Sequence, residues 1–187
     1  MGINDEKIAL RREIKKRLKD ISQREKKKKS SLICGELFNL LNSLKLSPNF
    51  TLGVYAPLKE EVDIGLEPLK GYVQRWAFPD IDQEMMIFRQ CHFEDLKESE
   101  DFGVRLLTPP KEAPLVNPDI LLIPGLAFND KGQRLGRGKG FYDRFLENYQ
   151  GATIGVCFSE QIEESIPVDD HDVLVDYVVS ESGNLRN

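Results

Sequence analysis

Residues 119–128 read Asp-Ile-Leu-Leu-Ile-Pro-Gly-Leu-Ala-Phe, and residues 131–144 read Lys-Gly-Gln-Arg-Leu-Gly-Arg-Gly-Lys-Gly-Phe-Tyr-Asp-Arg. The continuous apolar run over 119–123 is typical of a strand that is buried on both faces of a parallel sheet. Residues 131–140 form a glycine-rich loop, and residues 141–149, which follow it, are predicted to form a helix. A buried strand, a loop and a helix in this order predict one unit of an α/β fold.

The rest of the chain alternates between strand and helix patterns. Leu10, Ile14, Leu18 and Ile21 recur at helical spacing, which predicts a helix over 5–20 with Asn4 as its N-terminal cap. Further helices are expected over 23–44 and 64–74, and strands over 51–56, 75–78, 85–91, 152–158 and 176–180. Residues 94–118 contain four prolines and are expected to be mostly irregular. This alternation predicts a mostly parallel sheet, in which ligands bind outside the carboxyl ends of the strands.

The composition is that of an ordinary globular protein, and one domain over residues 1–187 is expected. The chain has 40% hydrophobic and 30% charged residues, and no apolar run approaches the roughly 20 residues of a membrane helix. Cys34, Cys91 and Cys157 are scattered without a Cys-x-x-Cys pair, so neither a disulfide framework nor a zinc site is expected. The N-terminal stretch is charged rather than apolar, so no secretory signal is visible. The scattered cysteines fit a reducing cytoplasm best, which is the expected location.

The net charge of −5 is unevenly distributed along the chain. Residues 1–30 carry twelve Lys or Arg against five Asp or Glu, whereas residues 31–187 carry 14 against 26. A basic nucleic-acid binder would not have this distribution. The run Lys26–Lys29 is the one feature that favours such a partner, but a solvated corner between two helices is the favoured interpretation, because runs of charge are usually solvated.

The glycine-rich loop has the residue types of a polyphosphate site. Glycine has no Cβ and permits positive φ, so that successive N–H groups can point at one anion, and a helix N-terminus adds partial positive charge. Asp143, just after the loop, could hold a divalent cation between protein and phosphates. The spacing is neither a Walker A loop nor the Gly-x-Gly-x-x-Gly dinucleotide motif. Its cations are Lys131, Arg134, Arg137, Lys139 and Arg144.

Four segments, in order along the chain, resemble the 5-formyltetrahydrofolate cyclo-ligase family, also called 5,10-methenyltetrahydrofolate synthetase. The longest comprises Pro-Gly-Leu-Ala-Phe at 124–128 and Gly-Gln-Arg-Leu-Gly-Arg-Gly-Lys-Gly-Phe-Tyr-Asp at 132–143. The others are Lys-Ile-Ala-Leu-Arg at 7–11, Tyr-Ala-Pro-Leu-Lys-Glu-Glu-Val-Asp at 55–63 and Ile-Pro-Val-Asp-Asp-His-Asp at 166–172. Two positions depart, because the family commonly has Asp where Asn129 stands and Tyr where Phe141 stands.

The resemblance implies a three-layer αβα fold with a mostly parallel, Rossmann-like central sheet. It also implies an enzyme that converts ATP and 5-formyltetrahydrofolate into 5,10-methenyltetrahydrofolate, ADP and phosphate with the help of Mg²⁺. The formyl oxygen is an amide oxygen and leaves poorly. Transfer of the γ-phosphoryl group to it gives an iminium phosphate, and attack by N10 then closes the ring and releases phosphate. The protein's tasks are to align the formyl oxygen with the γ-phosphorus and to neutralise charge on the transferring phosphoryl group.

The resemblance also assigns residues to roles. The ATP-binding positions fall on Lys7, Ile8, Ala9, Leu10 and Arg11, and on Arg134, Leu135, Gly136, Arg137, Gly138, Lys139, Gly140, Phe141 and Tyr142. The substrate positions fall on Ala56, Glu61, Arg137, Gly138, Lys139, Gly140 and Phe141. Glu60 stays open as an alternative to Glu61 because the two are adjacent. The magnesium positions fall on Asp143 and Asp172.

Purely structural interpretations stay open beside these roles. Lys7 and Arg11 could be a solvated helix face, Asp143 a first-turn acid, and Asp172 a surface acid. Phe141 and Tyr142 could simply pack the following helix. Two alternative functions also stay open: a nucleotide- or RNA-binding module without catalysis, and a relative that acts on a different substrate. The expected partners are ATP and the folate, without nucleic acid or membrane, and a monomer is expected.

Overall fold

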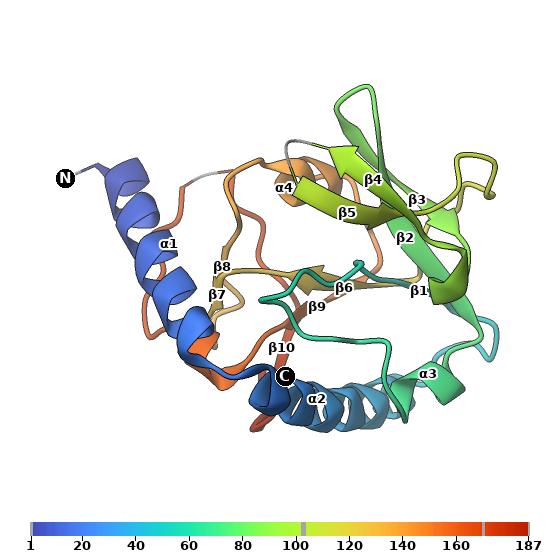
Figure 1. The fold of residues 1–187 in the computed structure, drawn as a ribbon, viewed down its shortest axis with the longest axis horizontal. Helices are drawn as coiled ribbons and strands as arrows, with labels where there is room; N and C mark the ends of the chain where they lie inside the picture. Colours follow the sequence, from blue (N-terminus) through green and yellow to red (C-terminus); the bar gives the residue numbers. More distant parts are fainter. Residues whose placement is uncertain (1, 102–103, 170, 187) are drawn as a thin grey trace.

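A seven-stranded, mostly parallel sheet forms the centre of the protein (Figure 1). The structure is a computed structural model that describes residues 2–101, 104–169 and 171–186. The strand order is β11-β10-β9-β6-β1-β2-β3, in which the inner five strands are parallel and the edge strands β3 and β11 are antiparallel. The strands are β1 (Thr51–Gly53), β2 (Arg75–Asp82), β3 (Met85–Gln90), β6 (Ile120–Pro124), β9 (Ala152–Val156), β10 (Tyr177–Ser180) and β11 (Gly183–Arg186).

Helices cover both faces of the sheet, which confirms the predicted three-layer α/β fold. On one face, α1 (Ile3–Asp20), α2 (Gln23–Ser43) and α3 (Leu69–Tyr72) share one hydrophobic core with Ile120 and Leu122 of β6. On the other, α4 (Phe141–Leu146) packs against Leu121 and Ile123 of the same strand (Figure 1). Successive side chains of a strand point to opposite faces. The apolar run of β6 therefore supplies both halves of the core.

The order of the strands places a switch point between β1 and β6. The chain passes from β1 to its neighbour β2 on one side, and later enters β6 on the other side of β1. The connections after β1 and β6 therefore leave the carboxyl edge of the sheet side by side. Open α/β sheets bind ligands at such a point. The segment around Glu61 and the glycine-rich loop both begin there.

Several local predictions were wrong. The described part of residues 94–118 is not mostly irregular, because β4 (Lys97–Asp101) and β5 (Val104–Thr108) pair as an antiparallel hairpin. The helix expected over 64–74 is limited to the four residues of α3. Strand β1 ends at Gly53 rather than at residue 56, and α4 ends at Leu146 rather than at 149. Asn4 does not cap α1, which begins at Ile3 after Gly2, whose N–H donates to Asp5.

The basic run Lys26–Lys29 lies within the first two turns of α2, and only part of it is solvated. Lys27 and Lys28 are exposed, as expected for a charged run. Lys26 is buried, and Lys29 forms ion pairs with Glu160 and, at 2.8 Å, with Glu181. Half of this run therefore anchors α2 to the protein instead of offering charge to a partner.

Candidate active site

The glycine-rich loop starts with a small hairpin that Asn129 organises. Strands β7 (Ala127–Phe128) and β8 (Arg134–Leu135) are antiparallel, and Asn129 is fully buried in the turn between them. Its Oδ1 accepts the N–H groups of Lys131 and Gln133 at 3.1 and 3.0 Å, and its Nδ2 donates to Oε1 of Gln133 at 2.6 Å. Asn129 therefore has a structural role in shaping the start of the loop, which the sequence pattern did not reveal.

The segment from Gly136 to Gly140 adopts a backbone conformation that requires glycine. Gly138 and Gly140 have φ values of +97° and +68°, a region that side chains with a Cβ disfavour. Gly140 leads directly into α4. Arg11 of α1 lies beside the segment, where its Nε donates to the carbonyl oxygen of Gly136 at 2.9 Å. The predicted neighbours Arg11 and the glycine-rich loop are thus brought together although 125 residues separate Arg11 from Gly136.

Arg134 lies inside the loop rather than on its surface. Its side chain is 4% exposed, Nη2 donates to Oδ1 of Asp143 at 2.5 Å, and Nη1 donates to the carbonyl oxygen of Pro124 at 3.4 Å. The guanidinium lies 5.6 Å from the ring centre of Tyr142. Within the described residues, Nε of Arg134 is buried without a hydrogen-bond partner. A buried donor of this kind is costly, and an anionic ligand oxygen would satisfy it.

An ion pair joins the two connections at the switch point. Nε and Nη2 of Arg137 lie 3.0 and 2.8 Å from Oε1 of Glu61. Oε2 of Glu61 accepts the N–H of Leu58 at 3.0 Å. Glu61, rather than its neighbour Glu60, is thus the acid that the structure places against the loop. Ala56 lies between β1 and Glu61 and is half-buried.

Two tyrosines lie in the electrostatic field of Glu61. Burial raises the pKa of Tyr55, and the negative charge of Glu61 raises it further. The same two causes, in the same order, raise the pKa of Tyr142, whereas the charge of Arg134 opposes them. Tyr55 also donates to the carbonyl oxygen of Val62 at 3.1 Å. Both phenols therefore stay neutral hydrogen-bonding groups near physiological pH.

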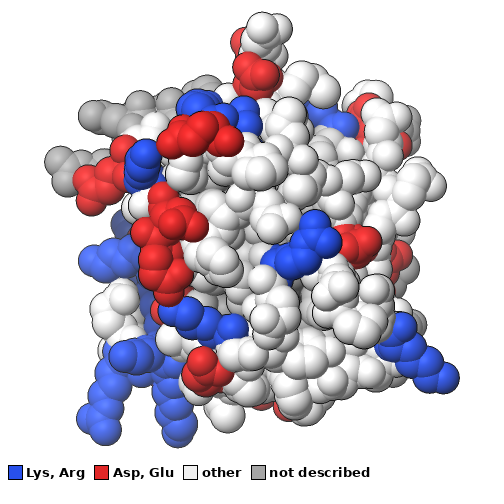
Figure 2. Space-filling view, turned by 90° about the vertical axis from the view of Figure 1, so that its right-hand side faces the viewer, with Lys and Arg blue, Asp and Glu red and all other residues white. Residues whose placement is uncertain are grey.

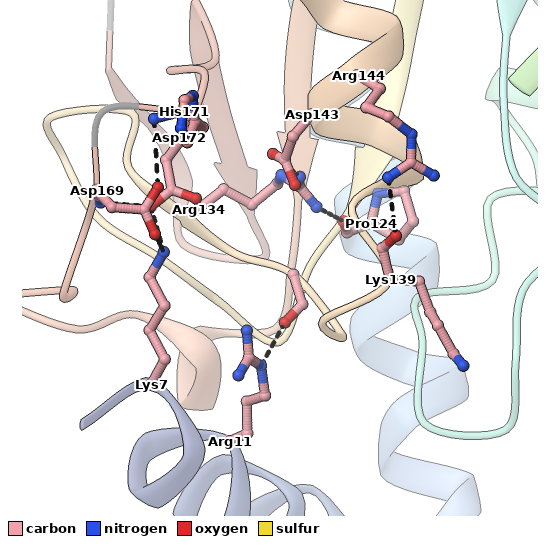
Figure 3. Close-up of polar contacts among 11 residues, drawn as sticks. Lys7, Arg11, Pro124, Arg134, Lys139, Asp143, Arg144, Asp169, His171 and Asp172 are labelled. Carbon is pink, nitrogen blue, oxygen red and sulfur yellow. Dashed lines mark hydrogen bonds and ion pairs between the residues drawn. The ribbon is translucent and has the colours of Figure 1, made fainter. Parts of the chain in front are cut away.

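Lys7 forms ion pairs that connect α1 to the segment before β10. Its Nζ lies 2.5 Å from Oδ2 of Asp172 and 2.9 Å from Oδ2 of Asp169, and Lys7 is 8% exposed (Figure 3). Burial lowers the pKa of Lys7, but its hydrogen bonds and ion pairs with the two carboxylates outweigh burial and raise it. Lys7 is therefore a charged, buried partner of Asp172 and not a solvated helix residue.

The carboxylates at the expected magnesium positions are each paired with a cation. Asp143 binds Arg134, and Asp172 binds Lys7. Across the described ranges, no group of three or more His, Cys, Asp or Glu side chains could hold a metal ion by itself. Mg²⁺ is typically held by one or two carboxylates with waters and phosphate oxygens. The donors present fit a cation that is shared with a bound polyphosphate.

The remaining predicted residues differ in accessibility. Ile8, Ala9 and Lys139 are exposed, Leu10 is half-buried, and Leu135 is fully buried in the core. The guanidinium of Arg144 lies over the ring of Phe141, at 5.1 Å from its centre. It also donates to the carbonyl oxygen of Lys139 (Figure 3). Leu135 therefore packs the core, and only its backbone can face a ligand.

A separate cavity of about 630 Å³ lies at the opposite end of the strands. Its lining includes Arg75 at the start of β2 and Gln90 at the end of the antiparallel β3. Both positions are at the amino edge of the parallel sheet. This cavity is not part of the site formed by Glu61 and the glycine-rich loop.

Comparisons with known proteins find relatives that cover nearly the whole chain. The 5-formyltetrahydrofolate cyclo-ligase of Mus musculus is 28% identical over 202 residues, which cover 96% of this chain and 95% of that protein. The solved 5,10-methenyltetrahydrofolate synthetase of Aquifex aeolicus is 29% identical with a TM-score of 0.80, over 95% of this chain and 91% of that one. The corresponding protein of Mycoplasma pneumoniae has a TM-score of 0.70 at 27% identity, over 94% and 98%.

A family model also matches the chain over nearly its whole length. Residues 3–181 match the 5-formyltetrahydrofolate cyclo-ligase family, and these residues include all four segments that carry the resemblance. The connections after β1 and β6, the first turns of α1 and the segment before β10 therefore all lie within the matched range. The chain belongs to the 5-formyltetrahydrofolate cyclo-ligase family of enzymes.

Proposed function

We propose that the protein, acting as one domain, converts 5-formyltetrahydrofolate to 5,10-methenyltetrahydrofolate with consumption of ATP. The family and the names of the related proteins support the folate conversion. The observation that carries the proposal is the position of the glycine-rich loop. It leaves the carboxyl end of β6 beside the connection from β1, where an α/β sheet binds ligands. Two substrates can meet there, one bound at the connection after β1 and the other at the connection after β6.

The nucleotide is proposed to bind along the glycine-rich loop and the first turns of α1. Gly138 and Gly140 permit the close approach of phosphates, and Nε of Arg134 offers an unpaired buried donor. Guanidinium groups bind phosphate oxygens through paired N–H donors, and a lysine acts as a point charge. The proposed ATP-binding residues remain Lys7, Ile8, Ala9, Leu10, Arg11, Arg134, Leu135, Gly136, Arg137, Gly138, Lys139, Gly140, Phe141 and Tyr142.

Asp143 and Asp172 are proposed to hold Mg²⁺ together with the phosphates. When bound there, the cation would neutralise charge on the transferring phosphoryl group. Arg134 and Lys7 hold these carboxylates in position, since each pairs with one of them. Because both carboxylates already carry a cation partner, we expect tight Mg²⁺ binding only when the nucleotide is present.

The folate is proposed to bind at the connection after β1. A carboxylate such as that of Glu61 suits the paired N–H donors of the pterin amide edge. Ala56, Arg137, Gly138, Lys139, Gly140 and Phe141 complete the proposed contact set. This arrangement would bring the formyl oxygen to the γ-phosphorus, so that phosphoryl transfer gives the iminium phosphate. Ring closure by N10 then releases phosphate. Alignment of the two substrates is the protein's main contribution.

Methenyl absorbance in the near ultraviolet tests the proposal directly. Purified protein, Mg-ATP and 5-formyltetrahydrofolate are mixed, and we expect the absorbance to rise only when all components are present. Asp143→Asn should turn over much more slowly at low Mg²⁺ concentration. Folded protein that binds ATP without any methenyl signal would contradict the proposal, and would favour a relative that acts on another substrate.

Nucleic acid is not the proposed partner. The face that Figure 2 shows carries both cationic and acidic side chains, with broad uncharged areas between them rather than one continuous basic surface. RNA binding that weakens steeply with salt, without ATP turnover, would support the alternative. Among the described residues, no helix is long and apolar enough to cross a membrane. We propose a cytoplasmic monomer that acts on small molecules.

A further inference from the structure

The Glu61–Arg137 ion pair uses the same two groups that the substrates are proposed to bind. Both Nε and Nη2 of Arg137 point at one oxygen of Glu61, at 3.0 and 2.8 Å, and the other oxygen accepts the N–H of Leu58. The Glu61 side chain is 8% exposed and that of Arg137 is 36% exposed. The carboxylate is therefore enclosed and already hydrogen-bonded, whereas the guanidinium remains open to a ligand from solution.

Each proposed ligand competes for one member of this pair. Phosphate oxygens of the nucleotide attract the guanidinium of Arg137, since an arginine fork matches their geometry. The N–H donors of the pterin require the carboxylate oxygens of Glu61. Neither residue is fully available while the two are bound to each other. Breaking the pair without a replacement would leave a nearly buried carboxylate without its cation, which is costly.

Resting on the proposed function, we infer that the Glu61–Arg137 pair couples the binding of the two substrates. Phosphates draw Arg137 away from Glu61, and the freed carboxylate then receives the pterin. The ligand that arrives second finds the pair already open. By thermodynamic linkage, the folate must strengthen nucleotide binding by the same factor. Arg137 is accordingly a residue that positions Glu61 as well as one that contacts phosphate.

Calorimetry with a nucleotide that cannot transfer its phosphoryl group tests this coupling. The Kd of 5-formyltetrahydrofolate is measured with and without saturating Mg-AMP-PNP, and the Kd of AMP-PNP is measured with and without the folate. For the wild type we expect roughly tenfold tightening in both directions, a common size for coupled sites. Equal Kd values with and without the second ligand would overturn the inference while leaving the proposed function intact.

Variants identify the pair as the cause of the coupling. In Arg137→Gln the carboxylate of Glu61 is no longer held by a guanidinium, so the folate Kd should become independent of nucleotide. Arg137→Lys keeps the charge without the fork and should retain part of the coupling. Lys70→Gln, which breaks the exposed 2.7 Å pair with Glu94, is a matched control and should couple like wild type. Full coupling in Arg137→Gln would also overturn the inference.

Different results would refute the proposed function and the proposed coupling. If either ligand does not bind in any combination, the proposed function falls and the coupling falls with it. If methenyl absorbance rises normally but the two Kd values are independent, only the coupling is refuted. Melting curves of each variant show whether a lost response comes from a lost fold.

Discussion

Lys7 and Asp172 form an ion pair with Nζ and Oδ2 2.5 Å apart, although 165 residues separate them in the sequence. Asp169 supplies a second carboxylate at 2.9 Å. This contact holds the first helix against the segment before β10, at the edge of the site. One lysine therefore links the first turns of α1 with the segment before β10, and its loss should affect both stability and nucleotide binding.

Lys7→Met removes the charge and keeps the length of the side chain. Because both hydrogen bonds of Lys7 go to ionised carboxylates, we expect the free energy of unfolding to fall by about 1.5–3 kcal/mol. The measurement is urea denaturation followed by circular dichroism. Lys16→Met, at an exposed position on the same helix, should change stability by less than about 0.5 kcal/mol. Equal effects of the two substitutions would refute the structural role of Lys7.

Gly138→Ala places a Cβ where the backbone has φ +97°. The added Cβ would lie 3.5 Å from the guanidinium of Arg11, which is ordinary contact, so the cost comes from the backbone conformation. We expect a loss of about 1–2 kcal/mol in stability and a higher KM for ATP. Gly183→Ala, at φ +108° with open space around it, should lose similar stability with an unchanged KM. A normal KM in Gly138→Ala would separate this glycine from nucleotide binding.

The fold could be predicted from the sequence where the pattern is long and local. The apolar run of β6 and the helical spacing of α1 and α2 gave their positions to within two residues. The glycine-rich loop could be placed at the carboxyl edge because it follows a buried parallel strand. These features depend on residues close together in the chain, which a sequence shows directly.

The features that the sequence did not predict depend on contacts between residues that are distant in the chain. Strand β4 begins with Lys97 and Glu98, which have no apolar alternation, and it forms because β5 pairs with it. The partners of Glu61 and Lys7 lie 76 and 162 or more residues away, so spacing could not reveal them. The helix expected over 64–74 is cut short because Pro68 occupies the position before α3. Propensity alone does not determine such boundaries.

Asp80 should make the protein sensitive to acid. Burial alone would raise the pKa of Asp80, but the hydrogen bonds and charges of Lys111 and Arg89 outweigh it and hold the pKa below 3.8. The folded state therefore binds a proton less readily than the unfolded state. The stabilisation is complete above about pH 4 and is lost as the pH falls through the lowered pKa.

Asp80→Asn should reduce this dependence. We expect the free energy of unfolding of the wild type to fall more steeply between about pH 4 and pH 2 than that of Asp80→Asn. Denaturant titrations at each pH measure both slopes. Asp82→Asn, on the exposed end of the same strand, should keep the wild-type slope. If the free energies of unfolding of wild type and Asp80→Asn change in parallel with pH, then the contacts of Asp80 with Arg89 and Lys111 do not govern acid sensitivity.

Asn129 offers a test of how the loop is held, because the family commonly has Asp at this position. Aspartate would keep the oxygen that accepts the N–H groups of Lys131 and Gln133, but would lose the donor to Oε1 of Gln133. Asn129→Ala removes all three bonds and leaves the N–H groups of Lys131 and Gln133 without this acceptor. We therefore expect Asn129→Ala to lose about 1–3 kcal/mol and Asn129→Asp clearly less. Thermal unfolding ranks the variants, and an equal loss in both would mean that packing, rather than the accepting oxygen, stabilises the turn.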